Sequence, residues 1–154
     1  MRPPGGRRSP WLGWSVAFAV PAEVAFDYLA DPANRPQWQS SLRRVELLDE
    51  GPPHVGQRWR DVTAVPGVVP EMRTSALERP TLWVEEGHWR SVAATGALRL
   101  EPTPTGCVVR VAARLRVPGL LAPLGPLLTV AAGVAVVPDL RRAARVLADR
   151  DDAS

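Results

Sequence analysis

The sequence has no lysine, no isoleucine, one cysteine (Cys107) and two histidines, His54 and His88. A single cysteine excludes an internal disulfide framework, and it excludes zinc and iron–sulfur sites that need several thiolates. Two histidines exclude a histidine-rich metal cluster, so we expect no metal ion and no cofactor. Any catalytic apparatus must rest on very few groups, which favours binding over enzymatic chemistry.

All 19 basic residues are therefore arginine, against 16 acidic residues and with an isoelectric point near 10.3. Because the codons for lysine and isoleucine are mostly AT-rich, their absence indicates a GC-rich, bacterial genome. Much of the arginine excess then follows from codon bias. A nucleic-acid-binding protein gathers its basic residues on one face. Here the arginines are spread along the chain, and we expect no nucleic-acid partner.

A chain of 154 residues with 45% hydrophobic content is typical of one compact domain. We expect a basic tail over 1–11, a single domain over 12–150 and a polar tail over 151–154. The arginines of the first tail and the apolar residues after it are similar to a signal peptide. However, Pro10 interrupts the apolar stretch, and residues 14–20 alternate as a strand does. We therefore expect a cytoplasmic protein.

The segment 117–138 has no charged residue and is long enough to cross a membrane. It contains prolines at 118, 123, 126 and 138, which would leave carbonyl groups unpaired in lipid. We therefore expect a buried core helix preceded by a turn, and no integral membrane span. Peripheral membrane contact is the alternative.

Hydrophobic periodicity predicts a strand over 12–20, a short helix over 22–30 and a second short turn through Trp38. Turn signals then separate strands over 45–49, 57–65, 72–78, 82–90, 94–101 and 107–117. In the last strand alternate residues are apolar, while Arg110, Arg114 and Arg116 face the other way. After residue 119 the period becomes helical, and Pro138 kinks or splits one long C-terminal helix. Because the strands follow one another and the helices are separated from them in the sequence, the order of elements indicates an α+β fold.

Three segments, taken in order, resemble the polyketide cyclase/dehydrase branch of the START-like (SRPBCC) superfamily. The opening Val20-Pro21-Ala22-Glu23-Val24 through Asp31-Pro32, followed by Trp38, resembles that family's strand, helix start and tryptophan. Val55-Gly56-Gln57-Arg58-Trp59-Arg60 is similar to its Val-Gly-Thr-Arg-aromatic-Arg segment, and Thr105-Gly106-Cys107-Val108-Val109 resembles its Gly-Thr-x-Val strand start. The resemblance covers 14–150 and implies a helix-grip fold. In that fold a curved antiparallel sheet wraps around a long C-terminal helix and encloses an apolar cavity.

Polar groups inside such a cavity are the candidates for catalysis, and the first is Asp61. It shares strand parity with Trp59 and Thr63, opposite to Arg58 and Arg60, which we expect in water. An inward Asp61 is costly unless it is hydrogen-bonded or paired. The alternative is an edge-strand carboxylate paired with a neighbouring arginine.

The other two candidates lie on the strand 82–90, whose orientation the sequence does not determine. Trp83, Glu85 and Trp89 share one parity, and His88 has the other. If the tryptophans face inward, Glu85 is a buried base. If His88 faces inward, it pairs with Asp61, although a lone strand histidine is more often structural or exposed. The candidate catalytic residues are thus Asp61, Glu85 and His88.

We expect the cavity to be lined by apolar and aromatic side chains. Tyr28, the only tyrosine, would lie near the cavity mouth and donate a hydrogen bond to a ligand, with core packing as the alternative. For Trp38 the alternative is a structural role, in which it fills the junction between helix and sheet. The candidate ligand-binding residues are Tyr28, Trp38, Trp59, Thr63, Trp83, Trp89, Leu124 and Leu128.

The resemblance implies binding of a hydrophobic or aromatic small molecule, polyketide-like or lipid-like, by a monomer or homodimer. A first alternative is a polyketide aromatase/cyclase or dehydratase, whose cavity holds a chain in a reactive geometry while polar groups move protons. A second alternative is a regulatory or stress-response module that binds another protein through its surface. Fold alone does not choose among these functions.

Overall fold

The computed structural model describes residues 14–154, so the predicted tail over 1–11 and the start of the first strand lie outside the described residues. The predicted order of elements is confirmed. That order is β1 (Ser15–Phe18), α1 (Ala22–Leu29), η1 (Pro32–Asn34), α2 (Arg35–Trp38), β2 (Leu42–Leu47), β3 (Arg58–Thr63), β4 (Glu71–Glu78), β5 (Leu82–Trp89), β6 (Val92–Thr103), β7 (Gly106–Arg116), η2 (Gly119–Leu124) and α3 (Gly125–Asp152).

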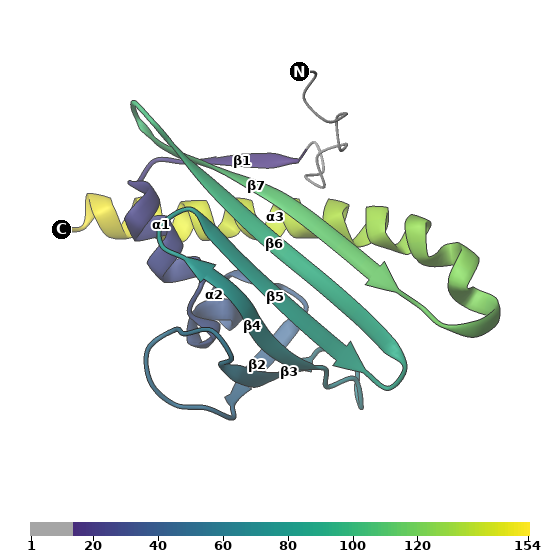
Figure 1. The fold of residues 1–154 in the computed structure, drawn as a ribbon. Coiled ribbons are helices and arrows are strands. Elements are labelled where there is room, and N and C mark those ends of the chain that lie inside the picture. Colours follow the sequence, from purple (N-terminus) through teal and green to yellow (C-terminus); the bar gives the residue numbers. More distant parts are fainter. Residues whose placement is uncertain (1–13) are drawn as a thin grey trace, which may run out of the picture.

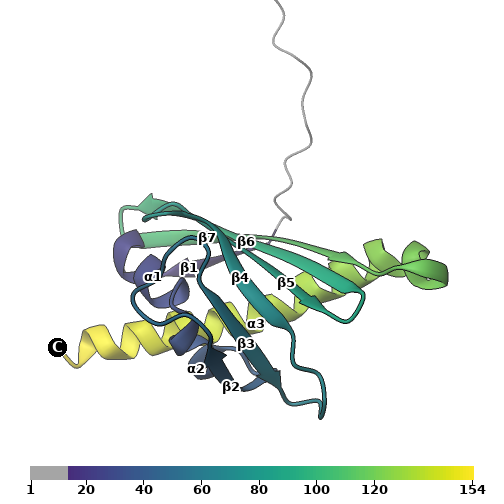
Figure 2. The same cartoon turned by 60° about the horizontal axis from the view of Figure 1, so that its bottom comes forward.

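The seven strands form one antiparallel sheet in the order β1-β7-β6-β5-β4-β3-β2. The long helix α3 crosses one face of this sheet, and α1 and α2 lie beside its C-terminal half (Figures 1 and 2). The fold is therefore α+β and helix-grip-like, as expected from the run of strands and the single long helix.

Strand alternation divides the sheet into two faces. On the inner face, which α3 covers, Trp83 pairs with Leu98 and Leu98 with Val111, and all three side chains are buried. On the outer face the register places Arg99 beside Arg110. The expected arginine-lined outer face of β7 is confirmed. The core is completed by Leu140, Ala143 and Leu147 in the C-terminal half of α3, together with α1.

The N-terminal half of α3 differs from the prediction, since most of its apolar side chains are exposed. Leu120 in η2 is 99% exposed, Leu127 67% and Val134 54%. The physical reason is that, among the described residues, β1 pairs with β7 at residues 107–110 and Trp14 adds one further hydrogen bond from the Val111 N–H. Beyond these residues α3 lies at the edge of β7, where the Thr129 hydroxyl accepts a hydrogen bond from the Leu115 N–H.

The predicted burial of 117–138 is therefore wrong, although α3 continues unbroken through Pro138. By length and composition Gly119–Asp152 could cross a membrane, and only 11% of its most apolar window is buried. The C-terminal half of the same helix is packed in the core of a soluble fold.

Candidate functional site

Asp61 and Glu85 face the same side of the sheet and are joined by an arginine that was not among the predicted site residues. Arg35, at the start of α2, donates from Nη2 to Asp61 Oδ2 at 3.0 Å and from Nη1 to Glu85 Oε2 at 2.5 Å. The side chains of Arg35 and Asp61 are 3% and 6% exposed, whereas Glu85 is 16% exposed. Three elements, α2, β3 and β5, therefore meet in one buried polar cluster with Glu85 nearest to solvent.

Two predicted tryptophans enclose the guanidinium of this cluster. Arg35 Cζ lies 5.4 Å from the centroid of the Trp59 ring and 5.8 Å from that of Trp83. Trp59 also donates from Nε1 to Asp61 Oδ1 at 3.0 Å, so both carboxylate oxygens of Asp61 are hydrogen-bonded. Trp83 donates to the buried Thr74 hydroxyl. The expectation that an inward Asp61 needs a partner is thus met, and both rings pack on protein groups.

The cluster holds one cation and two carboxyl groups, and this imbalance shifts the pKa values of Arg35 and Glu85. Burial alone would lower the pKa of Arg35, but Glu85 and Asp61 together raise it above its usual value, so the guanidinium stays charged. Burial raises the pKa of Glu85, and the Asp61 charge adds to this, while Arg35 opposes it. Glu85 therefore binds a proton more readily than a free glutamate does. The buried Nε of Arg35 has no hydrogen-bond partner among the described residues.

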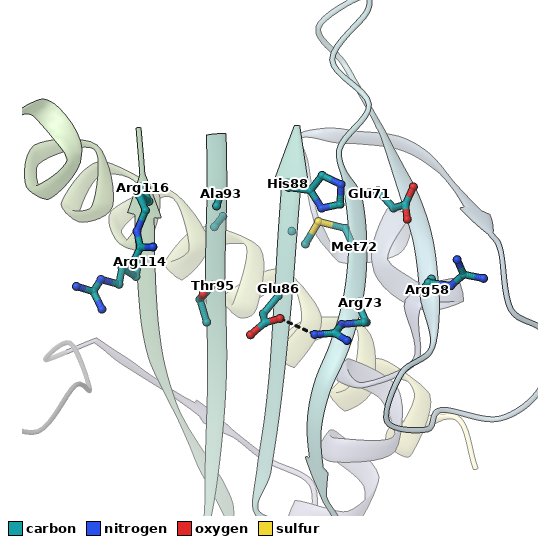
Figure 3. A pocket seen from close by; sticks show the side chains of 12 residues that line it. Arg58, Glu71, Met72, Arg73, Glu86, His88, Ala93, Thr95, Arg114 and Arg116 are labelled. Carbon is teal, nitrogen blue, oxygen red and sulfur yellow. Dashed lines mark hydrogen bonds and ion pairs between the residues drawn. The ribbon is translucent and has the colours of Figure 1, made fainter. Parts of the chain in front are cut away.

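His88 lies on the opposite face of the sheet from this cluster. On β5, Trp83 and Glu85 face inward and His88 faces outward, so the alternative pairing of His88 with Asp61 is excluded by strand parity. His88 is exposed beside a hollow of about 540 Å³ on the outer face, where Arg73 donates to Glu86 at 2.9 Å (Figure 3). It cannot contribute to chemistry at the Arg35 cluster.

The other predicted ligand-binding residues do not come together. Tyr28 is buried and its hydroxyl donates to Gln37 Oε1, and Trp38 is buried as well. The Thr63 hydroxyl is hydrogen-bonded to backbone carbonyls of the turn after β3. The remaining three are Trp89, which is half-buried under Arg90, and Leu124 and Leu128, which are exposed on η2 and α3. Their role in ligand binding stays a prediction.

A larger groove, of about 890 Å³, lies at the free edge of β7. It begins on the outer face, over apolar side chains of β5, β6 and β7, and continues around that edge to η2 and the first turns of α3. Among the described residues, β1 pairs with β7 at residues 107–110 and the Trp14 carbonyl accepts a hydrogen bond from the Val111 N–H, so the groove lies beside residues 112–116 of β7. Its lining consists of Leu82, Val84, Thr95, Ala97, Ala112, Ala113, Arg114, Leu115, Arg116, Val117, Ala122, Gly125, Pro126 and Thr129. None of the eight predicted ligand-binding residues is in this lining.

Arg35 could have been found from one signal in the sequence. It is the only basic residue between Arg8 and Arg43, and it lies in the helical segment that precedes the sheet. An inward carboxylate needs a buried cation. The arginines of the strands are excluded by their outward parity, so Arg35 is one of the few arginines left as a partner.

Comparison with known families and structures gives a consistent result. The profile of the family described as "Polyketide cyclase / dehydrase and lipid transport" matches residues 14–150. The comparison with curated proteins found no match.

Among solved structures, protein MLL2253 from Mesorhizobium loti is 20% identical with a TM-score of 0.66, over 89% of this chain and 95% of that one. The Zhui aromatase/cyclase from Streptomyces sp. R1128 is 20% identical with a TM-score of 0.65, over 89% and 92%. The di-domain ARO/CYC StfQ of the steffimycin pathway is 16% identical with a TM-score of 0.71, over 90% of this chain and 50% of that one. At these identities the structures show the fold alone.

Proposed function

Because the chain belongs to the polyketide cyclase/dehydrase and lipid transport family, we propose that it binds a hydrophobic or aromatic small molecule in the groove at the β7 edge. The observation that carries this proposal is the groove itself. Its volume of about 890 Å³ lies in the range of small-molecule sites, which are mostly apolar with a few polar groups.

The chemistry of the lining favours a flat or extended apolar ligand. Ala97 of β6 and Ala112 of β7 are cross-strand neighbours. Because their side chains are small, the groove is deep above them. Leu82 and Val84 form the apolar wall on β5. Arg114 and Arg116 of the lining supply cations, which suits a ligand with one carboxylate or enolate end.

A neutral apolar fluorophore, N-phenyl-1-naphthylamine, tests the proposal by titration. Ala112→Phe fills the groove floor, and we expect it to weaken binding at least tenfold. Ala17→Phe adds the same side chain at an exposed position of β1 outside the groove and serves as the matched control. Saturable binding that Ala112→Phe leaves unchanged would overturn the assignment of the groove, as would the absence of binding to the unaltered chain.

A second function, polyketide cyclisation or dehydration, is favoured by Glu85. Its carboxyl group has a raised pKa and is the most exposed member of the Arg35 cluster. Such a group can take a proton from a carbon between two carbonyls and return it to an oxygen. This chemistry takes place on the inner face, whereas the β5 and β6 side chains of the groove belong to the outer face, so the two functions use different sites.

Neighbouring residues of β5 provide the controls for this second function. We expect Glu85→Gln to abolish the formation of cyclised product from a linear polyketide chain supplied by a synthase. Glu86→Gln and His88→Ala lie on the outer face and should leave the product yield unchanged. Equal yields from all three variants, measured by mass spectrometry, would exclude Glu85 from catalysis.

A further inference from the structure

The apolar half of α3 has one continuous stripe that faces away from the sheet. Leu127, Val130 and Val134 follow each other at helical spacing and are all exposed. Gly125 and Ala143, which are buried, lie on the opposite side of the helix. At the end of the stripe η2 adds Leu120 and Leu121, and Figures 1 and 2 show this turn at the end of the molecule far from the C-terminus.

Positive charge lies at both ends of this stripe, hereafter the α3 stripe (Leu120, Leu121, Leu127, Val130 and Val134). Arg141 and Arg145 continue it along the helix, because they are seven and eleven residues after Val134. Arg114 and Arg116 lie at the end of β7, just before η2. All four are exposed, and no acidic residue occurs between 117 and 138.

We propose that the α3 stripe docks on the surface of a bilayer that contains anionic lipids. Interfacial helices bury their apolar face about 5–10 Å into the boundary between headgroups and acyl chains, with arginines at the headgroups. Arg141 follows Val130 by eleven residues, which is about 16 Å along the helix axis. A helix tilted with η2 lowest therefore places the leucines in the acyl region while the arginines reach the phosphates.

Charge complementarity favours a lipid surface over a second copy of the chain. Two copies paired through the α3 stripe would bring Arg141 and Arg145 of each copy beside residues of the other stripe, where no carboxylate is present. An anionic membrane supplies the missing negative charge. This inference goes beyond the proposed small-molecule binding and does not depend on it.

Flotation of the full chain with lipid vesicles tests the inference. We expect binding to vesicles of phosphatidylcholine mixed with anionic phosphatidylglycerol, little binding to phosphatidylcholine alone, and release at about 1 M salt. Leu120→Ser, Leu127→Ser and Val134→Ser together should reduce binding at least tenfold. Arg141→Gln with Arg145→Gln should weaken binding about fivefold for each arginine removed. The matched control is Arg43→Gln with Arg60→Gln, which removes the same charge from exposed positions of β2 and β3.

Two other results would overturn the inference. Equal loss of binding in the control pair would show that net charge, and not the α3 stripe, controls flotation. A dimer detected by light scattering that the three serine substitutions dissociate would make the stripe a subunit interface. Circular dichroism of each variant verifies that the fold is retained, which the exposure of the substituted residues leads us to expect.

Discussion

Replacement of Arg35 by methionine would remove the only cation of the buried cluster and leave Asp61 and Glu85 facing each other. Methionine retains most of the apolar contact with the two tryptophan rings, so the change isolates the loss of charge. The guanidinium is held by both carboxyl groups and lies within 5.8 Å of both ring centroids. Because the Arg35 side chain is only 3% exposed, water cannot easily take the place of the guanidinium beside the two carboxyl groups.

Removal of one partner from a buried ion pair costs about 3–5 kcal/mol, because the remaining charge stays buried without compensation. For a chain of this size that loss lowers the melting temperature by about 6–20 °C. Arg73→Met is the matched control, since Arg73 pairs with Glu86 on the outer face with both side chains about half exposed. Exposed pairs contribute little to stability, so we expect only a small change in the control.

The pH dependence provides a sharper test. The pKa of Glu85 is raised in the folded protein, so the folded state binds this proton more tightly than the unfolded state does. Stability from this group is therefore full at low pH and is lost as pH rises through the folded pKa. Without Arg35 the opposing influence disappears and the pKa of Glu85 rises further. The destabilisation caused by Arg35→Met should consequently be larger at about pH 8 than at about pH 5.

Urea denaturation followed by tryptophan fluorescence measures both effects. A free energy of unfolding that falls equally at the two pH values, or no further than in Arg73→Met, would refute the cluster as an electrostatic unit. The triple variant Arg35→Met, Asp61→Asn, Glu85→Gln should recover part of the loss, because neutral groups need no counter-charge in a buried site.

Three other outcomes follow from contacts of the core. Asp139→Ala leaves the Ser40 N–H and hydroxyl without their acceptor. The free energy of unfolding, measured in urea, should therefore fall by about 1–3 kcal/mol. An unchanged free energy would contradict this. Gly133→Ala places a Cβ against the Trp14 ring. The melting temperature should therefore fall, although alanine has a better helix propensity than glycine. A rise in melting temperature would show that the ring moves aside freely. Cys107 is buried and burial raises the pKa of its thiol, so a thiol reagent should label it only at the rate of unfolding, and rapid labelling of the native protein would contradict this.

The sequence predicted those features that depend on strand alternation. In β3 and β7, arginines on one parity were sufficient to orient Trp59, Asp61 and Val109, because the period of a strand is fixed by the backbone. The orientation of β5 was not predictable, since Trp83 and Val84 are both apolar and only the pairing of β5 with β6 decides between them. Burial of the α3 stripe was predicted wrongly because a helical apolar period shows that a face is apolar and does not show that a partner covers it.

The short strand β1 determines more than the groove at the β7 edge. A strand that paired with residues 112–116 of β7 would need the space beside Leu115 that Thr129 and Gly125 take. At this edge the Thr129 hydroxyl is hydrogen-bonded to both the N–H and the carbonyl of Leu115, while residues 112–114 have no strand partner on this side among the described residues. Such an edge can accept an extended peptide by strand addition. The start of α3 lies across this edge at Leu115, so it blocks strand addition at that residue.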